Sequence, residues 1–201
     1  MFQENPATGD RRISGSLASL GGLEAGDPLA PARIRLAHAL VLGFGGLPVI
    51  WMGDELGLLN DAGWAEEPGH EDDSRWAHRP RMPWPAGDSC FTDAHGVNAD
   101  LRALIAARKE LPHLHASTAA QVLDPRDPGV LLVARRHPLG VMLGAYNVAD
   151  RPAHVPHQLL HDLGLEPGHV VDRITGRAPE SWDDAVQLPA YGAVWLTSTS
   201  A

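Results

Sequence analysis

The 201-residue chain has a single cysteine, Cys90, so no disulfide can form within it. A lone cysteine suits a reducing compartment. No apolar run is long enough to cross a membrane. The sequence therefore predicts neither a disulfide-stapled scaffold nor a membrane-spanning protein.

Positive charge and aromatic residues are also scarce. Lysine and arginine number 16 against 25 aspartate and glutamate residues, which gives a formal charge of -9. Proteins that bind nucleic acid present clustered lysine and arginine, so we expect no nucleic-acid partner. The balance is compatible with a neutral substrate such as a sugar. Aromatic residues are only 5% of the chain, yet six of them are tryptophans.

The most readable stretch is a helix that leads into a buried strand. Asp27 and Pro28 favour a helix start, and apolar residues recur at helical spacing up to Phe44. After Gly45 and Gly46, residues 47–52 form an unbroken apolar run, which predicts a strand buried on both faces, as in parallel sheets. Asp54 and Glu55 follow at its carboxyl end. In α/β barrels that end carries the active site, although a simple turn after a buried strand would look alike.

The second half of the chain changes character. A helix is predicted from residue 98 or 99 to 111, where Pro112 ends it. Short apolar runs then alternate with turns at 130–135, 141–148, 169–173, 185–188 and 193–196. Short strands at near-regular spacing predict an antiparallel β-sandwich. We place the domain boundary near residues 112–118, with one domain at 1–115 and a second at 116–201.

Two long loops carry polar and aromatic side chains. Residues 1–26 contain Arg11 and Arg12, for which solvated surface charge is the simpler interpretation. Residues 56–94 gather tryptophan, carboxylate and guanidinium groups, which suit a hydroxyl-rich ligand, although tryptophans also anchor loops. His154, His157 and His161 have zinc-like spacing. Pro156 breaks the helix they would need, so surface histidines are expected and no metal is predicted.

Three segments together resemble the amylosucrases of the α-amylase superfamily. They are Asn-Pro-Ala-Thr-Gly-Asp-Arg-Arg-Ile-Ser-Gly at 5–15, GGLPVIWMGDELGLLND at 45–61, and Asp-Asp-Ser-Arg-Trp-Ala-His-Arg-Pro at 72–80. The resemblance implies α/β plus all-β architecture: the C-terminal part of a (β/α)8 TIM barrel followed by a β-sandwich. Residues 27–44 would be the seventh barrel helix, 47–52 the eighth strand and 98–111 the eighth helix.

The resemblance also implies site residues. Arg75 matches an arginine that contacts bound sucrose, and Arg12 matches one that holds the acceptor glucan. Asp54 and Glu55 would support the floor of the pocket, and Asp73 and His78 would stand in its wall. The implied partners are sucrose and α-glucan, with no cofactor.

The catalytic carboxylates implied by the resemblance are not in this chain. A retaining mechanism needs a nucleophile and an acid ~5–5.5 Å apart. In the family these follow barrel strands upstream of residue 1, so Met1 is not expected to be the natural start. Asp54 and Glu55 are adjacent on one strand end and would point in opposite directions. We expect a fragment of a glucosyltransferase that moves glucose from sucrose to α-1,4-glucan and releases fructose, inactive on its own.

Other interpretations remain open. The parent enzyme could be a sucrose hydrolase or another α-glucosidase of the superfamily. The chain could instead be a non-catalytic carbohydrate-binding or interaction protein, or a half-barrel that pairs with another chain. Oligomeric state is not predicted. The resemblance implies a bacterial cytoplasmic or secreted enzyme, and the lone cysteine favours the cytoplasm.

Overall fold

The computed structural model describes residues 2–4, 9, 11–87 and 91–199 and divides the chain into two compact units. The first comprises Met1–Ile34 and Ile50–Ala99, and the second comprises Arg35–Val49 and Asp100–Ala201. No described helix is long and apolar enough to cross a membrane. The two units are described separately.

The first unit consists of short elements joined by loops. Strands β1 (Phe2–Glu4) and β2 (Arg11–Ile13) pair antiparallel, and helix α1 (Leu17–Leu20) follows. The long second loop folds into three 3-10 turns: η1 (Asp54–Leu56), η2 (Trp64–Glu66) and η3 (Ser74–His78). Ala18, Ile34 and Val97 form a small buried cluster. This loop-rich unit therefore depends heavily on polar contacts for its shape.

Both long helices occur where periodicity predicts them. Helix α2 runs over Ala30–Gly43, and the carboxylate of Asp27 accepts a hydrogen bond from the Leu29 backbone N–H at 2.8 Å. Helix α3 runs over Val97–Lys109. The side chain of Asp93 caps its first turn, accepting from the N–H groups of Asn98 and Ala99. A 3-10 turn, η4 (Pro112–Leu114), then begins at Pro112.

The strand predicted at 47–52 is wrong for this chain. Residues 47–50 have no ladder partner, and Leu47 and Val49 are 90% and 78% exposed. A strand of a parallel sheet is stabilised by hydrogen bonds to neighbouring strands on both sides. Every strand pair among the described residues is antiparallel, so none offers this segment a parallel neighbour.

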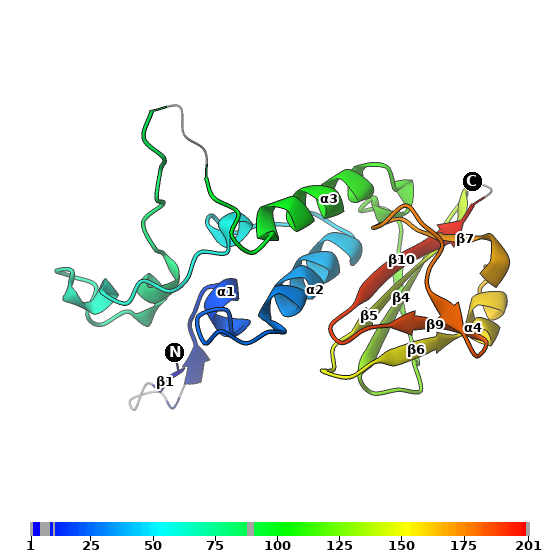
Figure 1. The fold of residues 1–201 in the computed structure, drawn as a ribbon, viewed down its shortest axis with the longest axis horizontal. Coiled ribbons are helices and arrows are strands. Elements are labelled where there is room, and N and C mark those ends of the chain that lie inside the picture. Colours follow the sequence, from blue (N-terminus) through cyan, green and yellow to red (C-terminus); the bar gives the residue numbers. More distant parts are fainter. Residues whose placement is uncertain (1, 5–8, 10, 88–90, 200–201) are drawn as a thin grey trace. The chain divides into compact units, whose positions relative to one another are not determined.

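The second unit contains the predicted antiparallel sandwich (Figure 1). One sheet has the order β3-β4-β5-β10-β7, and the other has the order β6-β9-β8. Their bounds are β3 Ala120–Leu123, β4 Val130–His137, β5 Gly140–Asn147, β6 Ala153–Pro156, β7 Val170–Asp172, β8 Ser181–Trp182, β9 Ala185–Leu188 and β10 Ala193–Ser198. Helix α4 (His157–Asp162) and the turn η5 (Pro167–His169) follow β6. Side chains from both sheets form one apolar core.

The end of α2 is fastened to the sandwich. Gly43 lies against Tyr146 and Trp195, whose buried Oη and Nε1 atoms are 3.1 Å apart in a hydrogen bond. Any side chain at position 43 would overlap these two atoms. The buried Arg135 of β4 donates to the carbonyls of Phe44, His113, His115 and Thr118. The guanidinium of Arg135 thus joins the end of α2, the linker (residues 112–118) and the sheet that contains β4.

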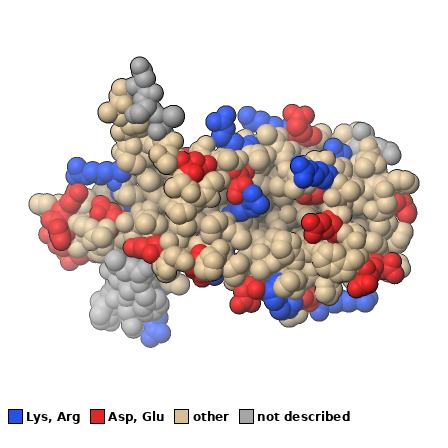
Figure 2. Space-filling view, in the orientation of Figure 1, with Lys and Arg blue, Asp and Glu red and all other residues tan. Residues whose placement is uncertain are grey.

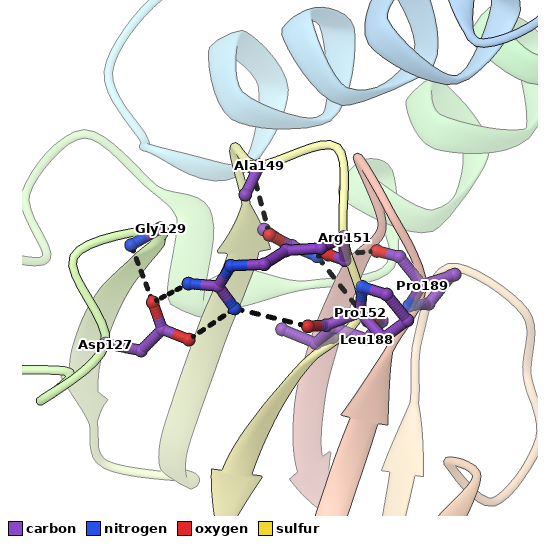
Figure 3. A network of polar contacts seen from close by, with 8 residues as sticks. Asp127, Gly129, Ala149, Arg151, Pro152, Leu188 and Pro189 are labelled. Atoms are coloured by element: carbon purple, nitrogen blue, oxygen red, sulfur yellow. Dashed lines mark hydrogen bonds and ion pairs between the residues drawn. The ribbon is translucent and has the colours of Figure 1, made fainter.

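A second polar network closes one corner of the sandwich (Figure 3). Arg151 makes a two-pronged ion pair with Asp127, which also accepts from the Gly129 N–H at 2.8 Å. The buried Asn147 donates to the carbonyls of Arg151 and Pro189. These contacts fix the turns between strands, and they have a structural role.

Candidate functional site

The loop after η2 presents an arginine in a fixed position. Arg75 Nε lies 2.7 and 2.9 Å from the two carboxylate oxygens of Asp73, and its Nη2 lies 2.7 Å from Oδ2. Asp73 also caps η3 by accepting from the Arg75 backbone N–H at 3.0 Å. These bonds from Arg75, with the charge of Arg79, lower the pKa of Asp73 to about 2. The pair of predicted site residues therefore stays ionised at neutral pH, and Arg75 Nη1 makes none of these bonds.

The same loop encloses a tryptophan. The ring of His70 stacks on Trp76 with centroids 3.7 Å apart and planes 8° apart, and the Arg79 guanidinium carbon lies 5.1 Å from the Trp76 centroid. Glu67 accepts from Arg81 with both oxygens at 3.0 Å. Trp76 thus packs against other side chains of the loop, as the structural alternative for this tryptophan predicts.

The segments at 5–15 and 72–80 touch through two serines. The hydroxyls of Ser14 and Ser74 are 3.1 Å apart, and both residues are buried. Ser14 follows directly on β2, the strand that holds Arg12. Ser74 directly precedes Arg75. The backbone positions of the two predicted substrate-binding arginines are therefore each within two residues of this contact.

The segment at 45–61 joins the other two at its end. Asn60 Oδ1 accepts from the Ser16 N–H at 2.8 Å, and the Asn60 N–H donates to the Ser19 hydroxyl at 2.9 Å. The neighbouring Asp61 N–H donates to the Ala77 carbonyl at 2.8 Å inside η3. The end of the 45–61 segment is thus bonded to the 72–80 segment and to Ser16 and Ser19, which directly follow the 5–15 segment.

The remaining predicted residues make contacts elsewhere in the first unit. Glu55 folds its carboxylate back to accept from the Gly53 N–H at 2.7 Å, and its carbonyl accepts from Asn98. Asp54 begins η1 beside it. The ring of His78 meets Trp51 edge-on, with centroids 6.3 Å apart. These contacts suit the predicted supporting roles but do not test them.

Arg12 is placed only by its backbone. It lies in β2 opposite Gln3, and its side chain is outside the described part of the structure. Its predicted contact with an acceptor glucan stays a prediction.

The histidine trio does not converge. His154 lies on β6, whereas His157 and His161 lie on α4, and His161 Nδ1 is 3.2 Å from a Glu166 oxygen. Within the described ranges, no three histidine, cysteine, aspartate or glutamate side chains are placed to hold a metal ion. Figure 2 shows acidic and basic side chains interspersed over the visible face rather than gathered into a basic strip.

Sequence reasoning missed the residues that assemble the site. Ser14, Asn60 and Ser74 lack the signature of a binding group, and their roles appear only when distant segments are in contact. The sequence Ser16-x-x-Ser19 was one available signal, because it marks the start of helix α1, where Ser16 caps the helix. Polar groups beside such a cap are free to bond to other segments.

A family model matches most of the predicted sandwich. Residues 120–197 match the model "Amylosucrase, C-terminal domain". This segment, the amylosucrase-like domain, is therefore similar to the C-terminal domain of amylosucrases. This match confirms the resemblance over most of the predicted sandwich, including its closing strand β10.

Longer matches extend beyond the amylosucrase-like domain. Glucosylglycerate phosphorylase from Escherichia coli K12 is 29% identical over 150 residues, which cover 73% of this chain and 26% of that protein. AmyP in complex with maltose superposes with a TM-score of 0.63 over 85% of this chain at 13% identity. An Anoxybacillus α-amylase gives 0.62 over 94% at 17% identity, and the trehalulose synthase MUTB gives 0.56 over 82% at 20%.

These structures establish the fold rather than the activity. The chain spans about a quarter of the curated relative and 36% to 38% of the three solved chains. Because the superpositions cover more than the amylosucrase-like domain, the similarity in fold also extends into the first unit.

Proposed function

We propose that this chain is the C-terminal part of an amylosucrase-like retaining glucosyltransferase, which transfers glucose from sucrose to α-1,4-glucan and releases fructose. The observation that carries the proposal is that residues 72–80 bond both to Ser14 of the 5–15 segment and to Asp61 of the 45–61 segment, ahead of an amylosucrase-like domain. Residues 1–115 would be the last part of the catalytic barrel, and 116–201 the sandwich. The exposed run at 47–52 would pair with barrel strands from outside this chain.

In this proposal the chain supplies part of the pocket wall. Asp73 holds Arg75 by two parallel hydrogen bonds, which fixes the direction of the guanidinium. Its Nη1 would donate to a sucrose oxygen near the bond that breaks. Arg12 would hold the acceptor glucan, and Asp54, Glu55 and His78 would support the floor. The nucleophile and the acid would come from segments outside these 201 residues.

A phosphorylase is the second candidate, favoured by the similarity to glucosylglycerate phosphorylase. Such an enzyme would pass the glucosyl group to phosphate instead of a glucan hydroxyl. A hydrolase would pass it to water. The three acceptors give three different products from one donor.

The test begins by reading the DNA upstream of the Met1 codon and expressing any enclosing open reading frame. With sucrose and glycogen, a transferase releases fructose and lengthens the glucan. Glucose 1-phosphate formed only with added phosphate would favour the phosphorylase, and free glucose the hydrolase. Arg75→Ala should lower kcat/KM on sucrose by about tenfold or more, since a charge-assisted hydrogen bond is worth about 1.5–3 kcal/mol.

Arg81→Ala is the matched control, because Arg81 lies in the same loop but pairs with Glu67. It should leave kcat/KM within about twofold, as expected for an exposed ion pair. The purified 201-residue chain should release no fructose. Turnover of sucrose by this chain alone would overturn the proposal that the nucleophile and the acid come from outside these 201 residues.

A further inference from the structure

The sheet β6-β9-β8 has an outward face that the proposed function does not use. Val155, Val186 and Leu188 belong to the sandwich core. Since successive side chains of a strand alternate between faces, His154, Pro156, Ala185 and Gln187 lie on the other side of the sheet. Trp182 pairs directly with Ala185, so it shares that outward face.

Trp182 is displayed on this face. Trp182 is 59% exposed, whereas Trp195 of the same sandwich is completely buried. Its cross-strand neighbour, Ala185, is small and only 8% exposed, so the larger residues on this face cover it. Burying an indole ring is strongly favourable, so an exposed tryptophan on the outward face of a sheet suits a ligand that covers the ring.

The hairpin that carries Trp182 is fixed. Asp183 and Asp184 both have positive φ, 50° and 55°, as the tight turn between β8 and β9 requires. Gln187 Nε2 donates to the carbonyls of Trp182 and Ala185 at 3.0 and 3.1 Å. The Asp184 carbonyl accepts from the His157 N–H at 2.8 Å. The ring therefore stands on a preorganised support, which lowers the entropy cost of binding.

The groups around the ring fit a neutral, hydroxyl-rich ligand. Gln187 is fixed by its nitrogen, and no hydrogen bond to its Oε1 is found in the described part of the chain, so that oxygen is an acceptor for a hydroxyl. The exposed His154 lies opposite Gln187 on the same face. Glu180, Asp183 and Asp184 border the hairpin and repel anionic ligands.

We propose that this face, the Trp182 face (His154, Pro156, Trp182, Ala185 and Gln187), binds a neutral α-glucan chain. The aromatic ring would stack on the C–H face of a glucose unit, while Gln187 and His154 bond its hydroxyls. The choice of α-glucan among neutral polysaccharides rests on the proposed function. The Trp182 face would hold a polymeric acceptor through residues other than those of the loop at 56–94, which contains Arg75.

Native gel electrophoresis of the complete 201-residue chain in gels cast with glycogen tests this proposal. The chain should migrate more slowly as glycogen increases, and Trp182→Ala should raise the apparent Kd by about fivefold or more, which corresponds to about 1 kcal/mol of ring stacking. Trp182→Phe should retain part of the retardation. Leu139→Ala, which removes another exposed apolar side chain of the sandwich, is the matched control and should change nothing.

Three results would overturn the proposal: no retardation of a folded chain, equal retardation of Trp182→Ala, or equal retardation in a β-glucan gel. The far-ultraviolet circular dichroism and the Tm of Trp182→Ala should match those of the parent, since the ring is exposed. Arg75→Ala should bind glycogen normally in this assay. If the enclosing enzyme fails to use sucrose but retardation still depends on Trp182, the proposed function fails while this inference stands.

Discussion

At the scale of single residues, the most sharply defined feature is the Asp73–Arg75 pair. Three hydrogen bonds from the Arg75 side chain and one from its backbone N–H stabilise the charged form of Asp73. The depressed pKa means that this pair favours the folded loop above pH ~3.8, the ordinary value for aspartate. That contribution disappears as the pH falls through about 2, where the folded carboxylate is protonated.

We therefore expect the Asp73 carboxyl carbon to titrate near pH 2 by NMR. Arg75→Gln removes the charged guanidinium and its two-point contact, and should raise the pKa of Asp73 towards 3.8. Arg81→Gln is the control and should leave it unchanged, because Arg81 bonds to Glu67. An Asp73 pKa near 3.8 in the parent chain would show that the pair does not persist in solution.

Residue types alone could identify part of this chemistry. Arg75 and Asp73 stand in a distinctive run of polar residues, and Trp195 stands in an apolar run and is buried. Trp182 could not be recognised as an exposed ring, because its exposure depends on a two-residue strand that pairs with distant β9. Ser14 and Ser74 are 60 residues apart, and nothing in either sequence neighbourhood announces the contact.

At the scale of elements, the sequence predicts a helix or strand correctly where the signal lies within one segment. It fails where the element depends on a distant partner. Helices α2 and α3 follow from spacing and end signals contained within each segment. The run at 47–52 has strand composition, but a strand is stable only beside its partners, and composition does not say whether they are present. Strand β3 was missed for the opposite reason: three of its four residues are exposed, so it lacks an apolar pattern.

The docking of α2 on the sandwich gives an element-scale prediction. Gly43→Ala would place a methyl group against Tyr146 Oη and Trp195 Nε1, both of which belong to buried rings that cannot move aside cheaply. We expect a loss of about 1–3 kcal/mol in the free energy of unfolding, measured by urea denaturation.

Gly168→Ala is the matched control for this substitution. A methyl group there meets no atom within 4 Å, and the residue lies in the turn η5 with no positive φ. It should change the stability by no more than about 0.5 kcal/mol. Equal stability of Gly43→Ala and the parent would mean that the end of α2 is not held against these rings.

At the scale of the whole molecule, the two units should differ in resistance to proteolysis. The second has a continuous apolar core between two sheets, whereas long loops make up much of the first. Loops with few buried contacts open most easily and are cut first. Trypsin should therefore cleave first after the exposed Arg81 and leave a resistant fragment that contains residues 116–201.

Mass spectrometry of a digestion time course measures this order. Early cleavage after Arg136 or Arg173, both within the sandwich, would contradict it. The sequence predicts a domain boundary near residue 115, where short strands replace helix periodicity, whereas the two compact units divide the chain at Ile34, Val49 and Ala99, and the boundary stays a prediction. The sequence could not predict how the linker is fixed, because Arg135 reaches four carbonyls that lie 17 to 91 positions away along the chain.

The way in which Arg135 is satisfied has a consequence for the response of the protein to ionic strength. Its guanidinium is bonded to backbone carbonyls, and no carboxylate is among its described partners. Dissolved ions screen exposed charge pairs such as Asp73–Arg75 and Asp127–Arg151, but they do not reach a buried cation held by dipoles. The exposed loop that contains Asp73 and Arg75 should therefore loosen at a lower salt concentration than the contacts of Arg135 with the end of α2, the linker and the sheet.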